Sequence, residues 1–244
     1  MHETDEESRR RLVRATTQQL ESLGRAGVTH LKKPPAAEPH EAPPASAAVA
    51  TSAATAAASP LEILRGEVEC CTRCEPLAAA RTQTVFGTGN PKARLCFLGE
   101  APGAEEDRQG EPFVGRSGQL LTKIIEACTL SRDEVFILNV LKCRPPDNRN
   151  PLPDEVANCR KFLDRQLEAI QPEFICCLGA VAAQTLLQTS RPIGRMRGKF
   201  FDYLGIRTMC TYHPAYLLRN PAAKKDCWED MQMLMREMGL SVPG

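Results

Sequence analysis

The chain has 244 residues, a net charge of +1 and 42% hydrophobic residues, enough for one substantial domain plus additional sequence. No apolar run approaches the roughly 20 residues of a membrane-spanning helix, and the charged start MHETDEESRRRL has no apolar segment of signal-peptide type. We therefore expect no membrane association and a soluble, intracellular, cytoplasmic protein. The balanced charge means that any nucleic-acid contact must depend on a local basic patch.

The first 60 residues differ in composition from the rest of the chain. Loosely spaced Leu and Val side chains suit one short helix over residues 5–25, and residues 32–60 consist mainly of Pro, Ala, Ser and Thr. Such a segment buries too little apolar surface to offset the entropy that it would lose on ordering. We predict a disordered amino-terminal tail over residues 1–60, open to transient repair or replication partners, and a folded domain over residues 61–244.

In the predicted domain, apolar runs of strand length alternate with segments of helical periodicity. Strands are predicted at 93–100, 135–143, 174–179 and 208–212, and helices at 118–128, 153–170, 180–187 and 224–238. Ser117 is expected to cap the first of these helices. Because the strands are apolar almost throughout, both faces of their sheet must be covered. The pattern predicts a three-layer α/β fold with a mostly parallel four-stranded sheet, helices on both faces, and a small hairpin, GKFFDYLGIR, inserted before the last strand.

Polar, turn-rich sequence follows three of these strands. GEAPGAEED comes after the first strand, Asn139 and KCRPP end the second, and HPAYLLRN comes after the fourth. In a parallel α/β sheet, ligands bind at the carboxyl ends of the strands. We therefore expect these three segments to form a single site.

Eleven cysteines without a secretion signal argue against a disulfide framework. Cys71 and Cys74 form a C-x-x-C pair, whereas Cys143 ends a predicted strand and Cys159 lies in the next predicted helix. Four such thiolates could hold zinc or a [4Fe–4S] cluster, and the wide separation of the second pair slightly favours the cluster. Cys70 could replace Cys71 in this set. The cysteines in apolar surroundings are expected to be core residues: Cys96, Cys128, Cys176, Cys177 and Cys210.

Together, the motifs resemble those of the family 4 uracil-DNA glycosylases, within the uracil-DNA glycosylase superfamily. From Cys71 to about Glu237 they occur in that family's order: CTRC, FGTGNPKA, GEAPGAEED, GEPFVGRSGQLL, LNVLKCRPPDNRNPLPDE, LGAVAAQTLL, RGKF and HPAYLLRNP. PFVGRSGQLL and HPAYLLRN carry most of the specificity. The resemblance implies a monomeric DNA-repair hydrolase that flips uracil out of DNA and cleaves its N-glycosidic bond, leaving an abasic site. It also implies a [4Fe–4S] cluster on Cys71, Cys74, Cys143 and Cys159.

Two side chains match the family's base-recognition positions. Phe113 matches the aromatic residue that stacks on the flipped base. Asn139 is a lone polar residue in an apolar strand, and its amide offers one hydrogen-bond donor and one acceptor. These groups match the O4 acceptor and the N3 donor of uracil, whereas cytosine would leave buried polar groups mispaired.

The resemblance places the chemistry at two other positions. Negative charge develops on uracil O2 as the base leaves, and His213 matches the family's catalytic histidine, which donates to that oxygen. Glu100 is the motif's acidic residue, suited to stabilise the cationic sugar or to orient water. The backbone of Ala101 and Pro102 is expected to line the pocket. Family 1 enzymes have a water-activating aspartate where this chain has Ala101, so no side chain there can activate water.

Contacts to DNA are expected from basic residues of RPIGRMRGK and from the end of HPAYLLRN. They are Arg195, Arg197, Lys199 and Arg219. These side chains would bind phosphates without reading the base sequence. Leu217, four residues after His213, matches the superfamily's wedge position and would fill the gap that the flipped nucleotide leaves.

Two alternatives are weighed against a catalytic uracil glycosylase. A related class becomes covalently trapped on its product and has a histidine in a basic insertion after the second strand, whereas RPPDNRNPLPDEVAN has none. A non-catalytic iron–sulfur DNA-binding module would not need Glu100, Phe113, Asn139 and His213 together. Both features favour the glycosylase, but the sequence leaves open its activity on other deaminated bases and its preference for single- or double-stranded DNA.

Overall fold

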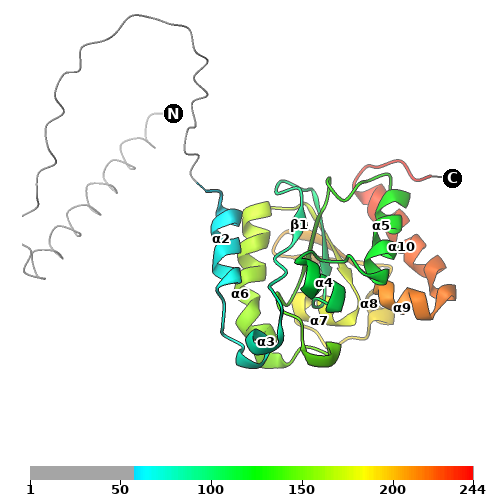
Figure 1. Cartoon of the computed structure of the whole chain (residues 1–244). Helices are drawn as coiled ribbons and strands as arrows, with labels where there is room; N and C mark the ends of the chain where they lie inside the picture. Colours follow the sequence, from blue (N-terminus) through cyan, green and yellow to red (C-terminus); the bar gives the residue numbers. More distant parts are fainter. Residues whose placement is uncertain (1–57, 244) are drawn as a thin grey trace, which may run out of the picture. The chain divides into compact units, whose positions relative to one another are not determined.

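The computed structural model describes residues 58–243, and a six-stranded mixed sheet runs through this part of the chain (Figure 1). The strand order is β1-β3-β2-β4-β6-β5. The strands are β1 Thr88–Gly89, β2 Leu95–Gly99, β3 Phe136–Asn139, β4 Phe174–Leu178, β5 Phe200–Tyr203 and β6 Ile206–Thr211. The four central strands are parallel to one another, and the edge strands β1 and β5 pair antiparallel with their neighbours.

Helices precede the sheet and connect its strands. They are α2 Pro60–Glu69, α3 Glu75–Ala80, α4 Ala104–Gln109, α5 Arg116–Ala127, α6 Pro153–Ile170, α7 Ala180–Leu187, α8 Ile193–Met196, α9 Pro214–Arg219 and α10 Lys224–Glu237, with 3-10 turns η1 Pro146–Asn148 and η2 Pro221–Ala223. A capping box between Ser59 and Glu62 stabilises the start of α2. Among residues 58–243, no helix has the length and apolar character needed to cross a bilayer.

The two faces of the sheet belong to two separate cores. Cys96 and Leu98 of β2 pack with residues of α2, α6 and α7, whereas Leu95 and Phe97 pack with residues of α5 and α10. Figure 1 shows α2 and α6 on one side of the sheet and α5 and α10 on the other. Because a strand's side chains alternate between the faces, a one-residue slip in register would exchange the two cores. Covering both faces therefore explains why the strands are apolar throughout.

The predicted fold class is confirmed, but the predicted strand number is wrong. β1 is only two residues long and too short to produce a periodicity. The GKFFDYLGIR hairpin exists, but its first strand, β5, pairs with β6 at the edge of the sheet. The hairpin therefore extends the main sheet instead of forming a separate insertion.

The long helices agree closely with their predicted spans, and one predicted cap is wrong. α6 and α7 have the predicted bounds, and α10 ends one residue before the predicted end. α5 begins at Arg116 with Gly115 as its N-cap, so Ser117 lies inside the helix and does not cap it. α2 begins at Pro60, and the helix predicted over residues 5–25 lies outside the described residues.

The parallel arrangement brings the predicted site segments to one edge of the sheet. Gly99 at the end of β2 pairs in register with Asn139 at the end of β3, so Glu100 follows directly beside Asn139. β6 ends at Thr211, two residues before His213. The consecutive strands β3 and β4 lie on opposite sides of β2, so the strand order reverses at β2. In a parallel sheet, a crevice opens at the carboxyl ends of the strands where the strand order reverses.

Candidate active site

An open cleft of about 640 Å³ lies at this edge of the sheet. It is lined by every residue predicted for the base pocket and by one predicted DNA contact: Glu100, Ala101, Pro102, Phe113, Asn139, His213 and Arg219. These residues come from the loops after β2 and β6, from the end of β3, from the turn before α5 and from the end of α9. The fold thus gathers widely separated segments into a single candidate active site.

Asn139 lines this cleft, and its buried amide oxygen has no hydrogen-bond partner among the described residues. Its side chain is 2% exposed, and nothing among the described residues donates to Oδ1. Gly99 makes room for the amide, because a Cβ on Gly99 would lie 2.3 Å from Oδ1 and 2.6 Å from the Phe113 ring. An unpaired buried acceptor costs about 1–3 kcal/mol. The amide is therefore placed to accept a hydrogen bond from a ligand.

The rings of Phe113 and His213 lie close together in the cleft. Their centroids are 5.6 Å apart and their planes are inclined by 35°. Phe113 has a left-handed backbone conformation, with φ of 56°, which is uncommon for a residue other than glycine. Its side chain is largely buried and lines the cleft. The ring therefore forms a flat apolar wall.

His213 is the N-cap of α9, and this role determines which ring nitrogen carries a hydrogen. Nδ1 accepts a hydrogen bond from the backbone N–H of Ala215 at 3.1 Å, so the neutral ring has its hydrogen on Nε2. Burial, with a smaller contribution from Arg219, lowers the pKa of His213 to about 4, and Glu106 acts in the opposite direction. At neutral pH the imidazole is therefore an uncharged donor through Nε2.

Glu100 is a carboxylate of the cleft whose side chain makes no hydrogen bond or ion pair among the described residues. Burial raises the pKa of its carboxyl group above the usual range. Of the other carboxylates that line the cleft, Glu105 pairs with Arg108 and Glu106 accepts bonds from backbone amides. Ala101 offers no side chain that can activate water, as its sequence position predicts.

Glu106 is a residue of the cleft that the sequence analysis does not single out. Its Oε1 accepts hydrogen bonds from the backbone N–H groups of Val114 at 3.0 Å and Gly115 at 3.1 Å, and its Oε2 accepts from Gly103 at 3.2 Å. One carboxylate therefore joins the loop after β2 to the turn that carries Phe113. The spacing from Gly103 to Glu106, typical of a capping box, is the sequence signal that could have identified it.

The cleft is also lined by polar residues that are absent from the predicted set, among them Arg116, Asn148 and Arg149. Arg116 begins α5, and Asn148 and Arg149 belong to the segment between β3 and α6. Arg149 makes a bidentate pair with Glu155, at 2.9 and 2.6 Å. Arg116 and Arg219 make no ion pair among the described residues and form a basic rim of the cleft, which a charge count over the whole chain cannot reveal.

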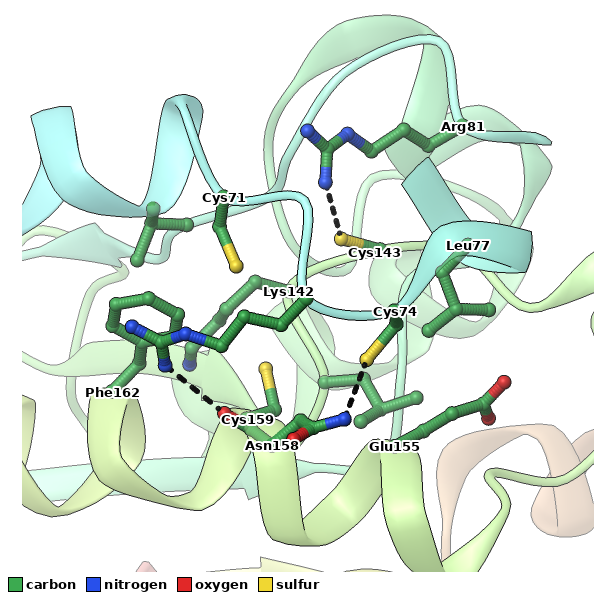
Figure 2. Close-up of a pocket in the computed structure, with 13 residues that line it drawn as sticks. Cys71, Cys74, Leu77, Arg81, Lys142, Cys143, Glu155, Asn158, Cys159 and Phe162 are labelled. Carbon is green, nitrogen blue, oxygen red and sulfur yellow. Dashed lines mark hydrogen bonds between the residues drawn. The ribbon is translucent and has the colours of Figure 1, made fainter. Parts of the chain in front are cut away.

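The four cysteines of the predicted cluster set line one pocket, distinct from the cleft. Figure 2 shows the sulfur atoms of Cys71, Cys74, Cys143 and Cys159 pointing toward a common space between α3, α6 and the segment that follows β3. Cys70 is exposed and does not line this pocket. Arg81 Nη1 donates to Cys143 Sγ at 3.0 Å, and Asn158 Nδ2 donates to Cys74 Sγ at 3.6 Å. Donors directed at sulfur are typical of thiolates that bind iron.

Lys142 gives a second indication of what this pocket fits. Its side chain is 1% exposed, and its Nζ donates to the carbonyl oxygen of Asn139 at 2.6 Å. Among the described residues no carboxylate pairs with it, and the acidic groups that act on it are the thiols of Cys143 and Cys159. A buried cation without an anionic partner is strongly unfavourable. The pocket therefore fits a negatively charged cofactor held by thiolates, although no group of His, Cys, Asp or Glu in the described part is arranged around a single metal ion.

The remaining cysteine prediction is confirmed. The five cysteines expected in the core are each at most 3% exposed: Cys96, Cys128, Cys176, Cys177 and Cys210. They are distributed between the two cores on either face of the sheet. They therefore act as small apolar side chains.

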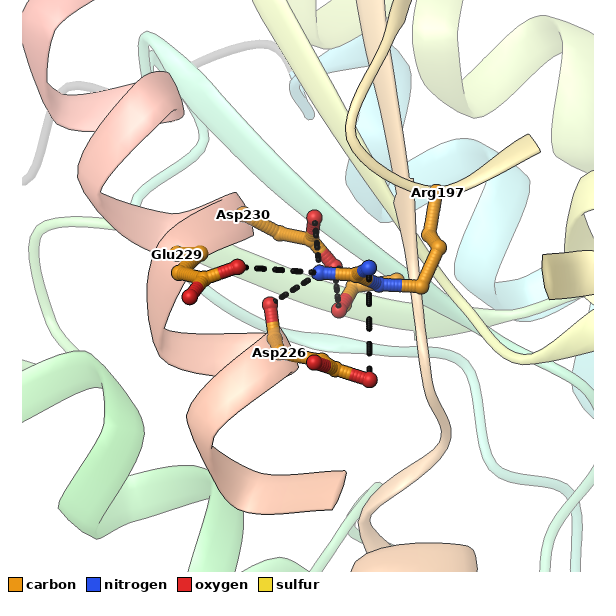
Figure 3. Close-up of polar contacts among 5 residues, drawn as sticks. Arg197, Asp226, Glu229 and Asp230 are labelled. Carbon is orange, nitrogen blue, oxygen red and sulfur yellow. Dashed lines mark hydrogen bonds and ion pairs between the residues drawn. The ribbon is translucent and has the colours of Figure 1, made fainter. Parts of the chain in front are cut away.

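Arg197 does not have the position that a phosphate contact requires. Its guanidinium makes two bonds to the fully buried carboxylate of Asp230, at 3.0 and 3.1 Å, and also approaches Asp226 and Glu229 of α10 (Figure 3). Thr211 Oγ1 donates to the same Asp230 carboxylate at 2.7 Å. Arg197 is thus a structural tie between α10 and the segment before β5, and its guanidinium is engaged within the protein instead of being directed at a phosphate. Arg195 and Lys199 are exposed.

Leu217 does not have the exposed position that the predicted wedge role requires. It is 1% exposed and packs with residues of α5 and α10 in the core on that face of the sheet. A side chain held there cannot fill a gap in DNA. Tyr216 and Leu218, its neighbours on α9, are 39% and 37% exposed.

Comparison with known proteins identifies the family of the chain. Residues 86–232 match the model of the uracil DNA glycosylase superfamily. A type-4 uracil-DNA glycosylase of Archaeoglobus fulgidus is 41% identical over 72% of this chain and 92% of its own length. Type-4 enzymes of Thermotoga maritima and Saccharolobus solfataricus are 46% and 43% identical, over 66% and 70% of this chain and 84% and 83% of their own lengths.

The chain therefore belongs to the uracil-DNA glycosylase superfamily. Its extensive similarity to the type-4 enzymes confirms the family that the motifs predict.

Proposed function

We propose that the chain excises uracil from DNA by hydrolysing the N-glycosidic bond, with a [4Fe–4S] cluster as a structural cofactor. One observation supports this function above the others. The unpaired Oδ1 of buried Asn139 lines the same cleft as the Phe113 ring and the uncharged, Nε2-protonated His213. A uracil base needs these three features: a partner for its N3–H, an apolar wall, and a donor for O2.

Recognition follows from the amide of Asn139. Its Oδ1 accepts from uracil N3–H and its Nδ2 donates to O4, while the base stacks on Phe113. Cytosine has an acceptor at N3 and a donor at the exocyclic position, so both contacts would become repulsive or unpaired. Such mispairing of buried polar groups gives strong discrimination between the bases.

Catalysis depends on charge that develops as the bond breaks. Nε2–H of His213 donates to uracil O2, where negative charge accumulates, and this bond strengthens in the transition state. A neutral imidazole stabilises the departing anion without transferring its proton. The carboxylate of Glu100 stabilises the positive charge on the sugar and orients the attacking water. Glu106 keeps the two loops of the pocket in place through its backbone contacts.

Cys71, Cys74, Cys143 and Cys159 would hold the cluster. When bound, the cluster would cross-link segments of the chain and would take no part in the hydrolysis. It would join the turn before α3, the segment that follows β3, and α6, and so support the end of β3, where Asn139 lies. Cys143→Ser should therefore remove the brown colour and the iron of the purified protein. Cys70→Ser, a matched change at an exposed thiol outside the pocket, should remove neither; equal loss in both variants would contradict this ligand set.

DNA binding is proposed for the basic rim of the cleft. Arg116 and Arg219 line the cleft and would bind phosphates on either side of the flipped nucleotide. Arg195 and Lys199 are exposed and would extend this contact. Leu218, the exposed leucine of α9, takes the wedge role that buried Leu217 cannot perform.

A direct assay tests the proposed function. The full-length protein is incubated with labelled oligonucleotides that differ only in one base, uracil, thymine or cytosine, and alkali then cleaves any abasic site. We expect cleavage of the uracil strand alone. A folded, iron-loaded protein that leaves the uracil strand intact would contradict the proposal, and a strand that stays covalently attached to the protein would instead indicate the trapped class.

A further inference from the structure

The stacking residue Phe113 lies in a turn that is unfavourable for its own backbone. Its φ of 56° is in the left-handed region, which side chains other than glycine rarely adopt. The surrounding structure must therefore determine this conformation. The turn packs so closely on α5 that a Cβ on Gly118 would lie 1.8 Å from the carbonyl oxygen of Phe113.

The two sides of this turn are held by different residues. Glu106 binds the N–H groups of Val114 and Gly115, which follow Phe113. Arg132, in the connection between α5 and β3, binds the carbonyl groups. Its Nη2 donates to Pro112 O at 2.8 Å and its Nη1 donates to Phe113 O at 3.2 Å.

Arg132 has no counter-ion among residues 58–243 within ion-pair distance. The charges of Glu111 and Asp133 act on it only from a greater distance. Besides the two carbonyl groups, its guanidinium approaches Thr122 Oγ1 of α5 at 3.4 Å. A half-buried arginine that directs its donors to two consecutive carbonyl groups loses hydration without gaining a salt bridge. This arrangement suits a residue that shapes the turn better than one that binds phosphate.

We propose that Arg132 is a positioning residue for the base pocket: it fixes the Pro112–Phe113 carbonyl groups and thereby holds the Phe113 ring against the uracil. The inference rests on the proposed function. Without the guanidinium, the two carbonyl groups lose their donors, and Phe113 can relax toward a negative φ. The ring would then leave the position in which it stacks, while the phosphate contacts at the cleft rim stay in place.

A double-mutant cycle tests this role. We expect Arg132→Gln to lower the single-turnover rate of uracil excision between about tenfold and a hundredfold, the usual effect of misplacing a pocket group by about 1 Å. The Kd for uracil-containing DNA should change less than about twofold. In a Phe113→Ala background, Arg132→Gln should cause no further loss of rate, because the ring that it positions is absent. Hydrogen exchange at the Val114 and Gly115 amides should accelerate in Arg132→Gln.

Arg94→Gln is the matched control, because Arg94 makes an equally well-formed bidentate contact, with Glu173, and does not line the cleft. It should leave the excision rate unchanged. If Arg132→Gln does not fold, the same cycle uses Arg132→Lys, which retains the charge but not the paired donors. Equal rate losses with and without Phe113, or no loss at all, would overturn the role of Arg132. Failure of the wild-type protein to excise uracil would instead overturn the proposed function.

Discussion

The ammonium group of Lys142 donates a 2.6 Å hydrogen bond to the backbone carbonyl of Asn139, and this bond connects the cysteine pocket to the active-site cleft. Lys142 precedes Cys143, and its side chain lies among the residues of the cysteine pocket (Figure 2). One buried cation thus contacts the base-reading strand while facing the thiols. Loss of an anion from the pocket would leave this cation without a partner, directly behind Asn139.

Lys142→Met should have opposite effects on the cluster-loaded and the cluster-free protein. In the cluster-loaded protein, the substitution removes a positive charge beside a negatively charged group, so iron release to a chelator should accelerate by about tenfold or more. In cluster-free protein the same substitution removes an unpaired buried charge, so the free energy of unfolding should rise. Iron release is followed by the loss of visible absorbance, and stability by urea denaturation. An unchanged release rate would show that the ammonium does not balance the charge of the cofactor.

Much of the fold and cleft is predictable because the signals are local. The parallel strands are continuous apolar runs, and the polar motifs directly follow their ends. The differences at the site concern side-chain direction. α9 has only six residues, too few for a periodicity that would show Leu217 facing inward, and Asp230 lies 33 residues after its partner Arg197. Glu106 is missed for a similar reason, since the amides of Val114 and Gly115 lie eight and nine residues away.

The different positions of Arg195 and Arg197 predict different effects of removing them. Arg195→Ala should flatten the dependence of log Kd for DNA on log salt concentration by about one unit, as for the loss of one phosphate contact. Arg197→Ala should leave this slope unchanged and destabilise the fold by about 3 kcal/mol or more, because it leaves the buried carboxylate of Asp230 unpaired. DNA-binding titrations at several salt concentrations and urea denaturation measure the two effects. A flatter slope in a fully stable Arg197→Ala variant would restore Arg197 as a DNA contact.

The lowered pKa of His213 predicts a pH dependence of stability. The folded protein protonates this ring only near pH 4, whereas an unfolded histidine does so near about 6.5. Stability is therefore fully present above about pH 6.5 and decreases as the pH falls toward 4, because the unfolded state alone takes up the proton. Relative to His213→Asn, which retains a capping acceptor, the loss should be about 2 kcal/mol at pH 5 and about 3 kcal/mol at pH 4. Urea midpoints at pH 7 and pH 5 measure it, and parallel pH profiles of the two proteins would contradict the buried neutral state.

Asn139→Asp tests how the base is read. A carboxylate cannot donate to uracil O4, so single-turnover excision of uracil should fall by about two orders of magnitude or more. Cytosine has an exocyclic amine that can donate to a carboxylate, so excision of cytosine should become detectable. The variant is compared with wild type on oligonucleotides that differ only in the target base. An unchanged ratio of uracil to cytosine excision would remove Asn139 from base recognition.

His213→Ala separates chemistry from binding. The bond from Nε2 to uracil O2 is strongest when the base carries negative charge, so its loss should appear mainly in the rate and little in the affinity. Single-turnover cleavage should fall by roughly two orders of magnitude or more, the usual scale for the loss of one such donor. The Kd for uracil-containing DNA should change by less than about fivefold, which is about 1 kcal/mol. His213 also caps α9 through Nδ1, so His213→Asn is the control that retains a capping acceptor but cannot place a donor at the Nε2 position. If both variants cleave at the wild-type rate while binding DNA poorly, His213 positions α9 against the DNA, and the catalytic effect assigned to it must come from Glu100 or the pocket backbone.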